Sequence, residues 1–350
     1  MQIRAEQWAG RRVLVTGHTG FKGGWLSLWL AELGAEVTGI GLAPEPGGFC
    51  DLVDVPSLVD SHIVDILDRD ALRSTISAAA PEVIFHLAAQ ALVLPSIEEP
   101  AATFATNVVG TANVLECTDG LDGLRAVLVV TSDKVYANDA SGRPFAESDR
   151  LGGGDPYSAS KAATELVVAS WRHTYPSAPP IVTARAGNVI GGGDVAVGRL
   201  FPDLLRAFAA DEEVVIRNPT STRPWQFVLE PVGGYLAYID AVLDGRDPPP
   251  ALNFGPPQDD ARTVAAMADQ AIGSWGSGSW RHEPGAHAIE APVLTLDSSL
   301  AAQSLDWHPV LDADEAAAWT VRWVRAQADG ADLAAFARQQ LDDFRRRAGW

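Results

Sequence analysis

A tyrosine and a lysine four residues apart, Tyr157 and Lys161, form a pattern that could carry out proton and hydride chemistry. On a helix, this spacing places a phenol and an ammonium on one face. A nearby positive charge favours the phenolate, and a phenolate can take a proton from an alcohol while hydride leaves the same carbon. Ser132 closely follows the apolar run 126–130 and supplies a third polar group. Together these residues predict the oxidation of an alcohol by a bound hydride acceptor.

Three glycines spaced GxxGxxG indicate where such an acceptor would bind. They lie between the apolar run 13–15 and a helical period that starts at Trp25, so a strand, a tight turn and a helix follow one another. The first two glycines allow the backbone to approach a pyrophosphate, whose charge then lies at the helix N-terminus. We expect a dinucleotide at this turn, in contact with Gly17, His18, Thr19, Gly20, Phe21, Lys22 and Gly23.

The segment after the second expected strand bears on which dinucleotide is bound. Residues 39–44 contain neither the acid that usually holds an adenosine ribose nor an arginine that would suit a 2′-phosphate. We favour NAD on this ground, and the sequence leaves NADP open. After the third strand, Asp65 and its neighbour Ile66 could contact the adenine, although a solvated loop acid would have the same sequence pattern.

The elements that must position these groups alternate between strands and helices. Apolar and β-branched runs predict strands at 13–15, 35–40, 63–64, 83–86, 126–130 and 181–184. Helical periods fall between them at 25–33, 71–79, 104–117 and 157–175. This alternation is typical of a parallel sheet with crossover helices, and the uninterrupted apolar run 126–130 fits a strand covered on both faces.

The alternation breaks after about Ala186, which indicates a second and less regular lobe. We predict an α/β fold, a doubly wound parallel (Rossmann) sheet with a smaller α/β substrate-binding lobe. Residues 1–185 are expected to form the dinucleotide-binding domain, with 226–258 returning to it. The smaller lobe then comprises residues 186–225 and 259–350.

Composition excludes several classes of protein. The 350 residues are 47% hydrophobic and 20% charged, which excludes a disordered chain. With 26 basic and 45 acidic side chains the net charge is −19, which argues against a nucleic-acid partner. We expect neither a membrane nor a metal, because no apolar run is long enough to span and no Cys/His tract has metal spacing. Two cysteines alone, Cys50 and Cys117, favour a reducing cytoplasm.

Several longer stretches resemble the extended short-chain dehydrogenase/reductases, and within them the nucleotide-sugar 4,6-dehydratases. These stretches are the turn 16–23, Thr-Ser-Asp-Lys at 131–134, Gly-Gly-Asp-Pro-Tyr-Ser at 153–158, and the segments 185–194 and 216–226. The resemblance extends over nearly the whole chain and is strongest to the members that act on CDP-glucose. The Asp133-Lys134 pair is typical of that branch, because dehydratases for other nucleotide sugars usually carry Glu at the lysine position.

The resemblance implies a role for each polar residue of the expected site. Tyr157, Ser132 and Lys161 would oxidise the sugar 4-hydroxyl to a ketone, which acidifies the hydrogen at C5. Lys134 would remove that hydrogen, and Asp133 would protonate the departing 6-hydroxyl before the stored hydride returns to C6. Lys134 must be neutral to act, so its pKa would have to be lowered by desolvation or by nearby positive charge.

Other positions match family residues that contact the ligands or a second subunit. Those expected beside the cofactor are Leu87, Ala88, Ala89, Gln90 and Asn107, with Tyr157 and Lys161. Those expected on the nucleotide-diphosphate sugar are Asn188 and three arginines whose guanidinium groups suit a diphosphate, Arg199, Arg217 and Arg223. The helix of Tyr157 often forms half of a four-helix dimer interface in the family, which implies a homodimer.

The chain departs from the family pattern at the edges of the expected site. Leu94 and Ile97 stand where Arg and Tyr are usual, and Ala43 stands where the family places its ribose-binding Asp. The other departures replace Trp, Asp and two His residues, at Val195, Gly198, Phe227 and Ile289. The chemical centre is intact, so the resemblance predicts the reaction type more firmly than the sugar nucleotide.

Three functions are compatible with these residues. The first is a lyase that removes water from a nucleotide hexose, which the Asp133-Lys134 pair favours. The second is a 4-epimerase or another nucleotide-sugar oxidoreductase that uses the same Tyr and Lys without elimination. The third is a cofactor-binding module without activity, which predicts a degraded Tyr/Lys pair that this sequence does not have. Asp133 and Lys134 could also be an ordinary solvated pair after a strand.

Overall fold

Seven parallel strands form the central sheet of the computed structural model, which describes residues 3–283 and 293–350. The strands lie in the order β11-β6-β5-β4-β1-β2-β3. Because β1 pairs with β2 on one side and β4 on the other, the strand order reverses next to β1, where α/β sheets bind ligands. The strands are β1 (Arg12–Thr16), β2 (Glu36–Gly41), β3 (Asp60–Ile63), β4 (Val83–His86), β5 (Ala126–Val130), β6 (Ile181–Ala186) and β11 (Ala251–Phe254).

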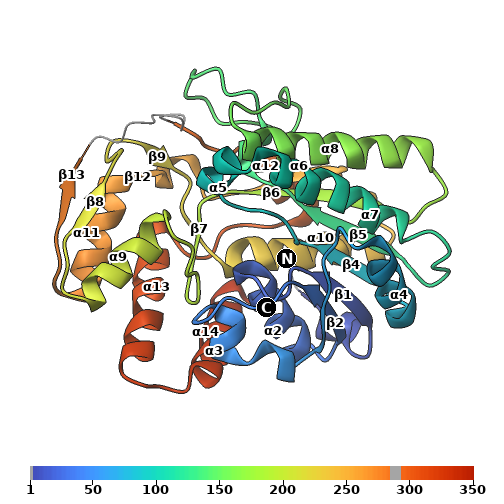
Figure 1. Ribbon diagram of the computed structural model, residues 1–350, viewed down its shortest axis with the longest axis horizontal. Coiled ribbons are helices and arrows are strands. Elements are labelled where there is room, and N and C mark those ends of the chain that lie inside the picture. The colour runs from blue at the N-terminus through green and yellow to red at the C-terminus, as the bar shows by residue number, and fades with distance from the viewer. Residues whose placement is uncertain (1–2, 284–292) are drawn as a thin grey trace.

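Helices cover both faces of this sheet (Figure 1), which confirms the doubly wound fold. Alternate residues of β5 belong to different apolar clusters: Leu128 packs on one face, and Val127 and Val129 on the other. This explains why its sequence is apolar without interruption. The helices packed on the Val127 side are α4 (Arg69–Ala79), α7 (Gly110–Glu116) and α8 (Pro156–Thr174), and those on the opposite side include α2 (Phe21–Glu32), α10 (Leu229–Leu243) and α14 (Leu333–Ala348).

Smaller elements gather at one end of the molecule, on the left of Figure 1. They include two short sheets, β8 with β13 and β9 with β12, and three helices. Their bounds are α9 (Leu200–Ala209), β8 (Val214–Ile216), β9 (Thr222–Arg223), β12 (Arg262–Thr263), α11 (Val264–Trp275), β13 (Trp280–His282) and α13 (Ala313–Ala328). Although α14 lies at the C-terminus, its Phe344 packs against Trp29 of α2 with ring centroids 6.0 Å apart. The exact domain boundaries remain a prediction.

The remaining elements are short and mostly connect the larger ones. They are α1 (Ala5–Trp8), α3 (Phe49–Val53), η1 (Val55–Ser57), α5 (Val93–Glu98), α6 (Pro100–Phe104), η2 (Ala105–Val109), η3 (Asp133–Val135), β7 (Val189–Ile190), β10 (Gln226–Phe227), η4 (Gln258–Asp260) and α12 (Ser299–Leu305). Within residues 3–283 and 293–350, the structure has no helix with the length and apolar character that crossing a membrane requires.

Three expected elements differ from those observed. The helix expected from Trp25 begins at Phe21, because Gly23 and Gly24 are tightly packed rather than part of a loop. The third strand, expected at 63–64, instead covers Asp60–Ile63. The helix expected over 104–117 is divided by a π-helical turn at Ala105–Val109, a distortion that often marks a functional site.

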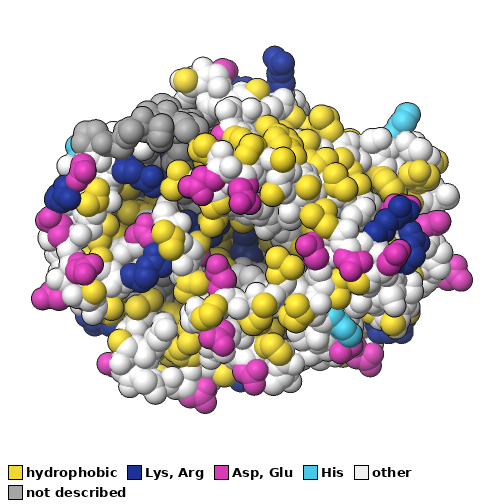
Figure 2. Space-filling model, viewed as in Figure 1, with side chains coloured by type: hydrophobic (Ala, Val, Ile, Leu, Met, Phe, Trp, Pro, Cys, Tyr) yellow, Lys and Arg dark blue, Asp and Glu magenta, His cyan; other side chains and the backbone are white. Residues whose placement is uncertain are grey.

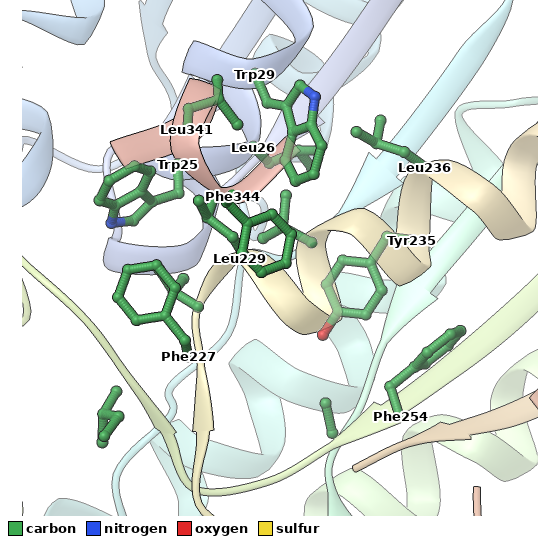
Figure 3. Packing of buried hydrophobic residues seen from close by; sticks show 14 of the residues in the cluster. Trp25, Leu26, Trp29, Phe227, Leu229, Tyr235, Leu236, Phe254, Leu341 and Phe344 are labelled. Carbon is green, nitrogen blue, oxygen red and sulfur yellow. The ribbon is translucent and has the colours of Figure 1, made fainter. Parts of the chain in front are cut away.

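A cluster of aromatic side chains supports the loop that leads from β6 towards α9. Trp25 lies 4.3 Å from Phe49 and 5.6 Å from Trp323 between ring centroids. Its indole Nε1 donates to the carbonyl oxygen of Gly192 at 3.0 Å. Figure 3 shows Trp25 beside Phe227 and the α14 side chains that continue this core. A Cβ on Gly192 would lie 2.0 Å from the Trp323 ring, so only glycine fits the contact.

Gly192→Ala should therefore destabilise the fold. We expect the free energy of unfolding to fall by about 1–3 kcal/mol, as for other overpacked cores, measured by urea denaturation. Gly273→Ala is the matched control, because Gly273 lies in α11 with no neighbour within 4 Å of an added Cβ. That change should leave stability equal or raise it by about 0.5–1 kcal/mol. A Gly192→Ala protein as stable as the parent would contradict the packing described here.

Candidate active site

A cavity of about 300 Å³ opens at the carboxyl ends of the central strands, where they face the segments 186–203 and 214–225. Figure 2 shows the hollow, with basic side chains inside it. In a protein of net charge −19, this cavity has more basic than acidic side chains in its lining. The basic ones are Lys22, Lys134, Arg199, Arg217 and Arg223, and the acidic ones are Asp133, Asp194 and Asp203. The cavity is therefore suited to an anionic ligand.

The glycine turn at the end of β1 has the shape that a dinucleotide pyrophosphate requires. Gly17 has a φ of +79°, and a Cβ there would lie 2.7 Å from the backbone nitrogen of Ala88. A Cβ on Gly23 would lie 1.9 Å from the carbonyl oxygen of Gly17. Gly20 begins α2 with no side-chain cap and no acid in the first turn, which leaves the first N–H groups for an anion. The residues present thus fit a dinucleotide.

Hydrogen bonds hold the end of β4 beside this turn. Thr16 Oγ1 accepts from the backbone nitrogens of Leu87 and Ala88, each at 3.2 Å. His86 contacts Thr16 Oγ1 at 2.7 Å through Nδ1 and Thr111 Oγ1 at 3.0 Å through Nε2, and burial lowers the pKa of His86 to about 3. His86 is therefore a neutral core residue with both ring nitrogens bonded, as expected for a structural histidine.

Asn107 links the segment after β4 to the helix that carries Tyr157. Its Oδ1 accepts from Gln90 N at 2.8 Å, while its Nδ2 donates to Gln90 O at 3.0 Å and to Ser160 Oγ at 2.8 Å. Asn107 lies in the π-helical turn η2, so this distortion places its amide between the two segments. Ala89 lies between Ala88 and Gln90 in the same segment.

The outer end of the dinucleotide site lacks an acidic group. β2 ends at Gly41, and Ala43, where the family pattern has Asp, is exposed. His18 is fully buried instead, with Nε2 2.7 Å from Ser61 Oγ, and burial lowers its pKa. Asp65 is exposed, and its Oδ1 accepts from Leu67 N at 2.9 Å, whereas the next residue, Ile66, is buried.

Ser132 is close to both the phenol of Tyr157 and the carboxyl of Asp133. Its Oγ donates to Asp133 Oδ1 at 2.9 Å. Burial raises the pKa of Tyr157, and the neighbouring Ser132 hydroxyl opposes this shift. Asp133 Oδ2 is buried without a partner, and a Cβ on Gly187 would lie 1.9 Å from it. Glycine at 187 therefore leaves room for the Asp133 carboxyl, and Ser132 stands next to both a potential base and a potential acid.

Two of the expected lysines lie close to Ser132, Asp133 and Tyr157. Lys161 Nζ donates to the carbonyl oxygen of Val130 at 3.2 Å, and burial lowers the pKa of Lys161 to about 7, with the positive charge of Lys22 adding to the shift. Lys134 is half-buried in the turn η3, and its side chain lines the cavity. Because η3 follows β5 directly, Lys134 and Asp133 face the same space as Tyr157.

The expected nucleotide-sugar contacts lie along the same cavity. Asn188 adopts a left-handed conformation with φ of 45°, a strained state that often marks a ligand site. Arg199 forms an ion pair with Asp194 at 3.1 Å, and Arg223 is buried whereas Arg217 is exposed. The structure thus brings together all four of the expected contacts.

The departures from the family pattern fall into three environments. Leu94 and Ile97, on α5, line the cavity and are 42% and 40% exposed, so they form part of its mouth, as does Gly198. Val195 lines a neighbouring cavity. Phe227 is fully buried between Trp25 and Trp319, where an apolar ring packs better than histidine. Ile289 lies outside the described residues.

A buried ion pair behind the site was not identified from the sequence. Glu165 of α8 accepts from Arg185 of β6 through both carboxylate oxygens, each at 2.9 Å. Arg185 Nη1 also donates to Tyr136 OH at 2.8 Å. A charged residue inside the fully buried strand 181–186 is the signal that could have indicated such a pair.

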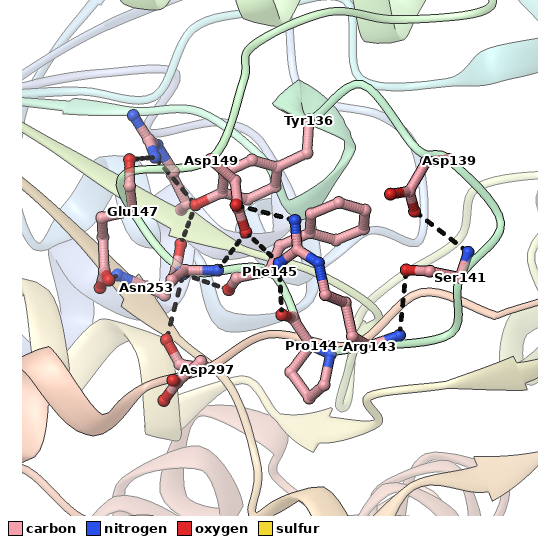
Figure 4. Close-up of polar contacts among 12 residues, drawn as sticks. Tyr136, Asp139, Ser141, Arg143, Pro144, Phe145, Glu147, Asp149, Asn253 and Asp297 are labelled. Carbon is pink, nitrogen blue, oxygen red and sulfur yellow. Dashed lines mark hydrogen bonds and ion pairs between the residues drawn. The ribbon is translucent and has the colours of Figure 1, made fainter.

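The loop before α8 is fastened to the same network, as Figure 4 shows. Tyr136 OH donates to Asn253 Oδ1 at 2.7 Å, and Asn253 Nδ2 donates to Phe145 O at 2.9 Å. The rings of Tyr136 and Phe145 stack with centroids 5.0 Å apart, and Arg143 pairs with Asp149 at 2.6 Å. These contacts hold the turn that contains Asp133 and Lys134 against the sheet.

Comparison with known proteins agrees with the geometry. Residues 13–255 match the NAD dependent epimerase/dehydratase family. The chain is also 42% identical over 347 residues to the CDP-glucose 4,6-dehydratase of Salmonella typhimurium, an alignment that covers 96% of this chain and 97% of the relative. The chain belongs to the NAD dependent epimerase/dehydratase family. The resemblance to the extended short-chain dehydrogenase/reductases is thereby confirmed.

Two more distant proteins also match over most of the chain, one in sequence and one in fold. The dTDP-glucose 4,6-dehydratase of Xanthomonas campestris pv. campestris is 27% identical over 330 residues, covering 89% of this chain and 92% of the relative. The crystal structure of UDP-glucose-4-epimerase from Stenotrophomonas maltophila, with bound NAD and formylated UDP-arabinopyranose, matches with a TM-score of 0.80 at 22% identity. That match covers 91% of this chain and 99% of the epimerase and shows the fold alone.

Proposed function

We propose that this protein is an NAD-dependent 4,6-dehydratase of a nucleotide-diphosphate hexose, with CDP-glucose as the substrate. The observation that carries the proposal is that Tyr157, Asp133 and Lys134 line one basic cavity, with Ser132 bonded to Asp133 and close to the Tyr157 phenol. The 42% identity to a CDP-glucose 4,6-dehydratase supports the same reaction and favours it over epimerisation. A 4-epimerase needs the tyrosine and lysine but has no use for an acid and an amine facing C5 and C6.

Each residue of the site then has a defined task. The residues of the glycine turn would hold NAD, which would supply the hydride chemistry at C4 and C6. Tyr157 takes the proton of the 4-hydroxyl, and the positive charge of Arg199 favours its phenolate. Lys161, one helical turn along α8, adds a second charge when it is protonated. Lys134 removes the C5 proton that the new ketone acidifies, and later returns it to C5. Asp133 donates its proton to the 6-oxygen as the C6–O bond breaks and water leaves.

Counting protons over this cycle gives Ser132 a specific task. At the end of one turnover Tyr157 holds the proton from the 4-hydroxyl, while Asp133 has lost a proton to the water that left. The centre is reset when one proton moves from the phenol to the carboxylate. We propose that Ser132, which donates to Asp133 Oδ1 at 2.9 Å and lies close to the Tyr157 phenol, passes this proton on. The reaction therefore needs no proton from solvent.

The same observations bear on the cofactor, the domains and the location of the enzyme. We propose NAD rather than NADP, because residues 39–44 carry no arginine for a 2′-phosphate and the family is NAD-dependent. We also propose residues 1–185 with 226–258 as the cofactor domain and the rest as the nucleotide-sugar lobe.

The cytoplasm is the proposed location, since Cys50 and Cys117 are both free and buried.

Product analysis tests the proposed reaction directly. The purified protein is incubated with NAD and, separately, with CDP-, dTDP-, UDP- and GDP-glucose, and the products are analysed by mass spectrometry. We expect loss of one water from CDP-glucose. A product of unchanged mass with inverted C4 would indicate the epimerase instead, and loss of water from none of the four would reject the dehydratase.

Two substitutions should separate the steps of the reaction. Tyr157→Phe should prevent cofactor reduction and lower kcat by about 10²–10⁴-fold, because proton abstraction from the 4-hydroxyl is lost. Lys134→Met should still allow cofactor reduction, seen as absorbance at 340 nm, but release no water. Unchanged unfolding curves are the control for both variants. Normal turnover by Lys134→Met would remove that amine from the mechanism.

We also infer that the protein is a homodimer, formed by a second copy packing on α6, η2 and α8. On these adjacent helices Phe104, Val109 and Leu166 are 39%, 51% and 60% exposed. Figure 2 shows hydrophobic side chains gathered over this region, at the upper right. Apolar side chains at this density on neighbouring helices are typical of a surface that a partner covers, and the family uses the Tyr157 helix in this way.

Leu166→Glu should break this dimer. We expect the dissociation constant to rise by about 100-fold or more, because two carboxylates would be buried per interface. Light scattering after gel filtration would then give the 37.1 kDa mass of one chain. The matched control is Ile63→Glu, an equally exposed position on the edge strand β3, which should leave the dimer intact. A parent protein that is monomeric at micromolar concentration would overturn the inference.

A further inference from the structure

Lysine occurs at only three positions in this chain, 22, 134 and 161, whereas the other 23 basic residues are arginine. All three lysines lie at the catalytic cavity. Lys22 and Lys134 line it, and Lys161 lies one helical turn beyond Tyr157 and interacts electrostatically with Lys22. Since the surface uses arginine throughout, an amine at these positions provides something that a guanidinium does not, namely a compact point charge on a slender stem. The proposed function uses Lys134 and Lys161, but not the side chain of Lys22.

Local structure does not explain a lysine at position 22. It is the second residue of α2, where the positive end of the helix dipole disfavours a cation, and the first turn contains no acid to offset it. Its side chain is half-buried and faces the cavity together with Asp133 and Tyr157. Burial and the charge of Arg199 lower the pKa of Lys22 to about 8, while Asp133 and Asp194 oppose this shift.

Two of the other cations at the site have partners of their own. Arg199 is paired with Asp194 at 3.1 Å, and Lys161 Nζ is bonded to the carbonyl oxygen of Val130. In the part of the chain that the structure describes, the ammonium of Lys22 has neither an ion pair nor a hydrogen bond. Asp133 likewise has one buried oxygen, Oδ2, without a partner. An uncommitted cation thus faces the carboxyl group whose charge must change during elimination.

We propose that Lys22 is a positioning residue for the elimination step, whose ammonium stabilises the carboxylate that forms on Asp133 as the sugar hydroxyl leaves. The inference rests on the proposed dehydration. In that step the O–H bond of the Asp133 carboxyl breaks, its proton joins the 6-oxygen, and the C6–O bond breaks with its electron pair so that water departs. Negative charge is thereby left on Asp133, and Lys22 keeps its own proton throughout.

A substrate that needs no acid gives a specific test. Fluoride leaves carbon without being protonated, so Asp133 and its stabilising charge become dispensable with CDP-6-deoxy-6-fluoroglucose. Lys22→Met should slow water loss from CDP-glucose by about 10- to 100-fold, the effect of one nearby charge on a carboxyl group. The same variant should release fluoride from the fluoro sugar within about threefold of the parent rate. Mass spectrometry follows the first reaction and a fluoride electrode the second.

Three further variants complete the experiment. Asp133→Asn should also lose activity on CDP-glucose but not on the fluoro sugar, and its loss on CDP-glucose should be larger than that of Lys22→Met. Lys22→Arg, which keeps the charge but not the compact head, should restore only part of the rate on CDP-glucose. If Lys22→Met does not fold, Lys22→Gln carries the same comparison. Calorimetric titration with NAD checks that the cofactor still binds in each variant.

The outcomes separate this inference from the proposed function. Equal slowing of Lys22→Met on both substrates, or parent-like turnover of CDP-glucose, would overturn the role of Lys22 while leaving the dehydratase in place. Failure of the parent protein to dehydrate any nucleotide sugar would reject the proposed function itself. Selective loss on CDP-glucose, with normal fluoride release, is the result that supports the inference.

Discussion

The geometry of the candidate site depends on one buried ion pair, between Glu165 of α8 and Arg185 of β6. Both carboxylate oxygens receive the guanidinium, and Thr131 and Thr183 each donate a further hydrogen bond to the same carboxylate. A charge pair out of water is stable only when its remaining bonds are satisfied in this way, and removing one partner typically costs about 3–5 kcal/mol. The pair fixes α8 against β5 and β6, and through Tyr136 it also reaches the turn after β5. Both segments that carry proton-transferring groups are therefore held by the same contact.

Charge is distributed unevenly in this molecule, and the distribution suits its ligands. The chain as a whole is strongly acidic, yet its main cavity is lined by more cations than anions. An acidic exterior repels polyanions in general, whereas the cavity attracts an anion small enough to enter it. The apolar rim formed by Leu94 and Ile97 limits where that anion can bind and leaves the deeper basic groups to hold it.

Sequence patterns predicted the sheet well because its strands are buried on both faces, so runs such as 126–130 are apolar without interruption. The glycine turn and the Tyr157–Lys161 pair were also predicted, since each depends on residues close in sequence. Features that depend on contacts between distant residues were not predicted. Helix α2 starts early because Gly23 packs on Gly17, and Phe227 is apolar because it lies between two tryptophans. The π-helical turn at Asn107 has no local pattern that predicts it, and the ion pair of Glu165 is indicated only by the charge of Arg185 inside a buried strand.

The confinement of lysine to a single cavity makes this protein unusually convenient for spectroscopy. Isotopic labelling of lysine side chains would produce three nuclear magnetic resonance signals, one for each position 22, 134 and 161. Every such signal would come from the catalytic centre, without background from the exterior, where arginine takes the place of lysine. The protonation of each amine could then be followed separately, in the free enzyme and during ligand titration, without overlap from lysines elsewhere in the chain.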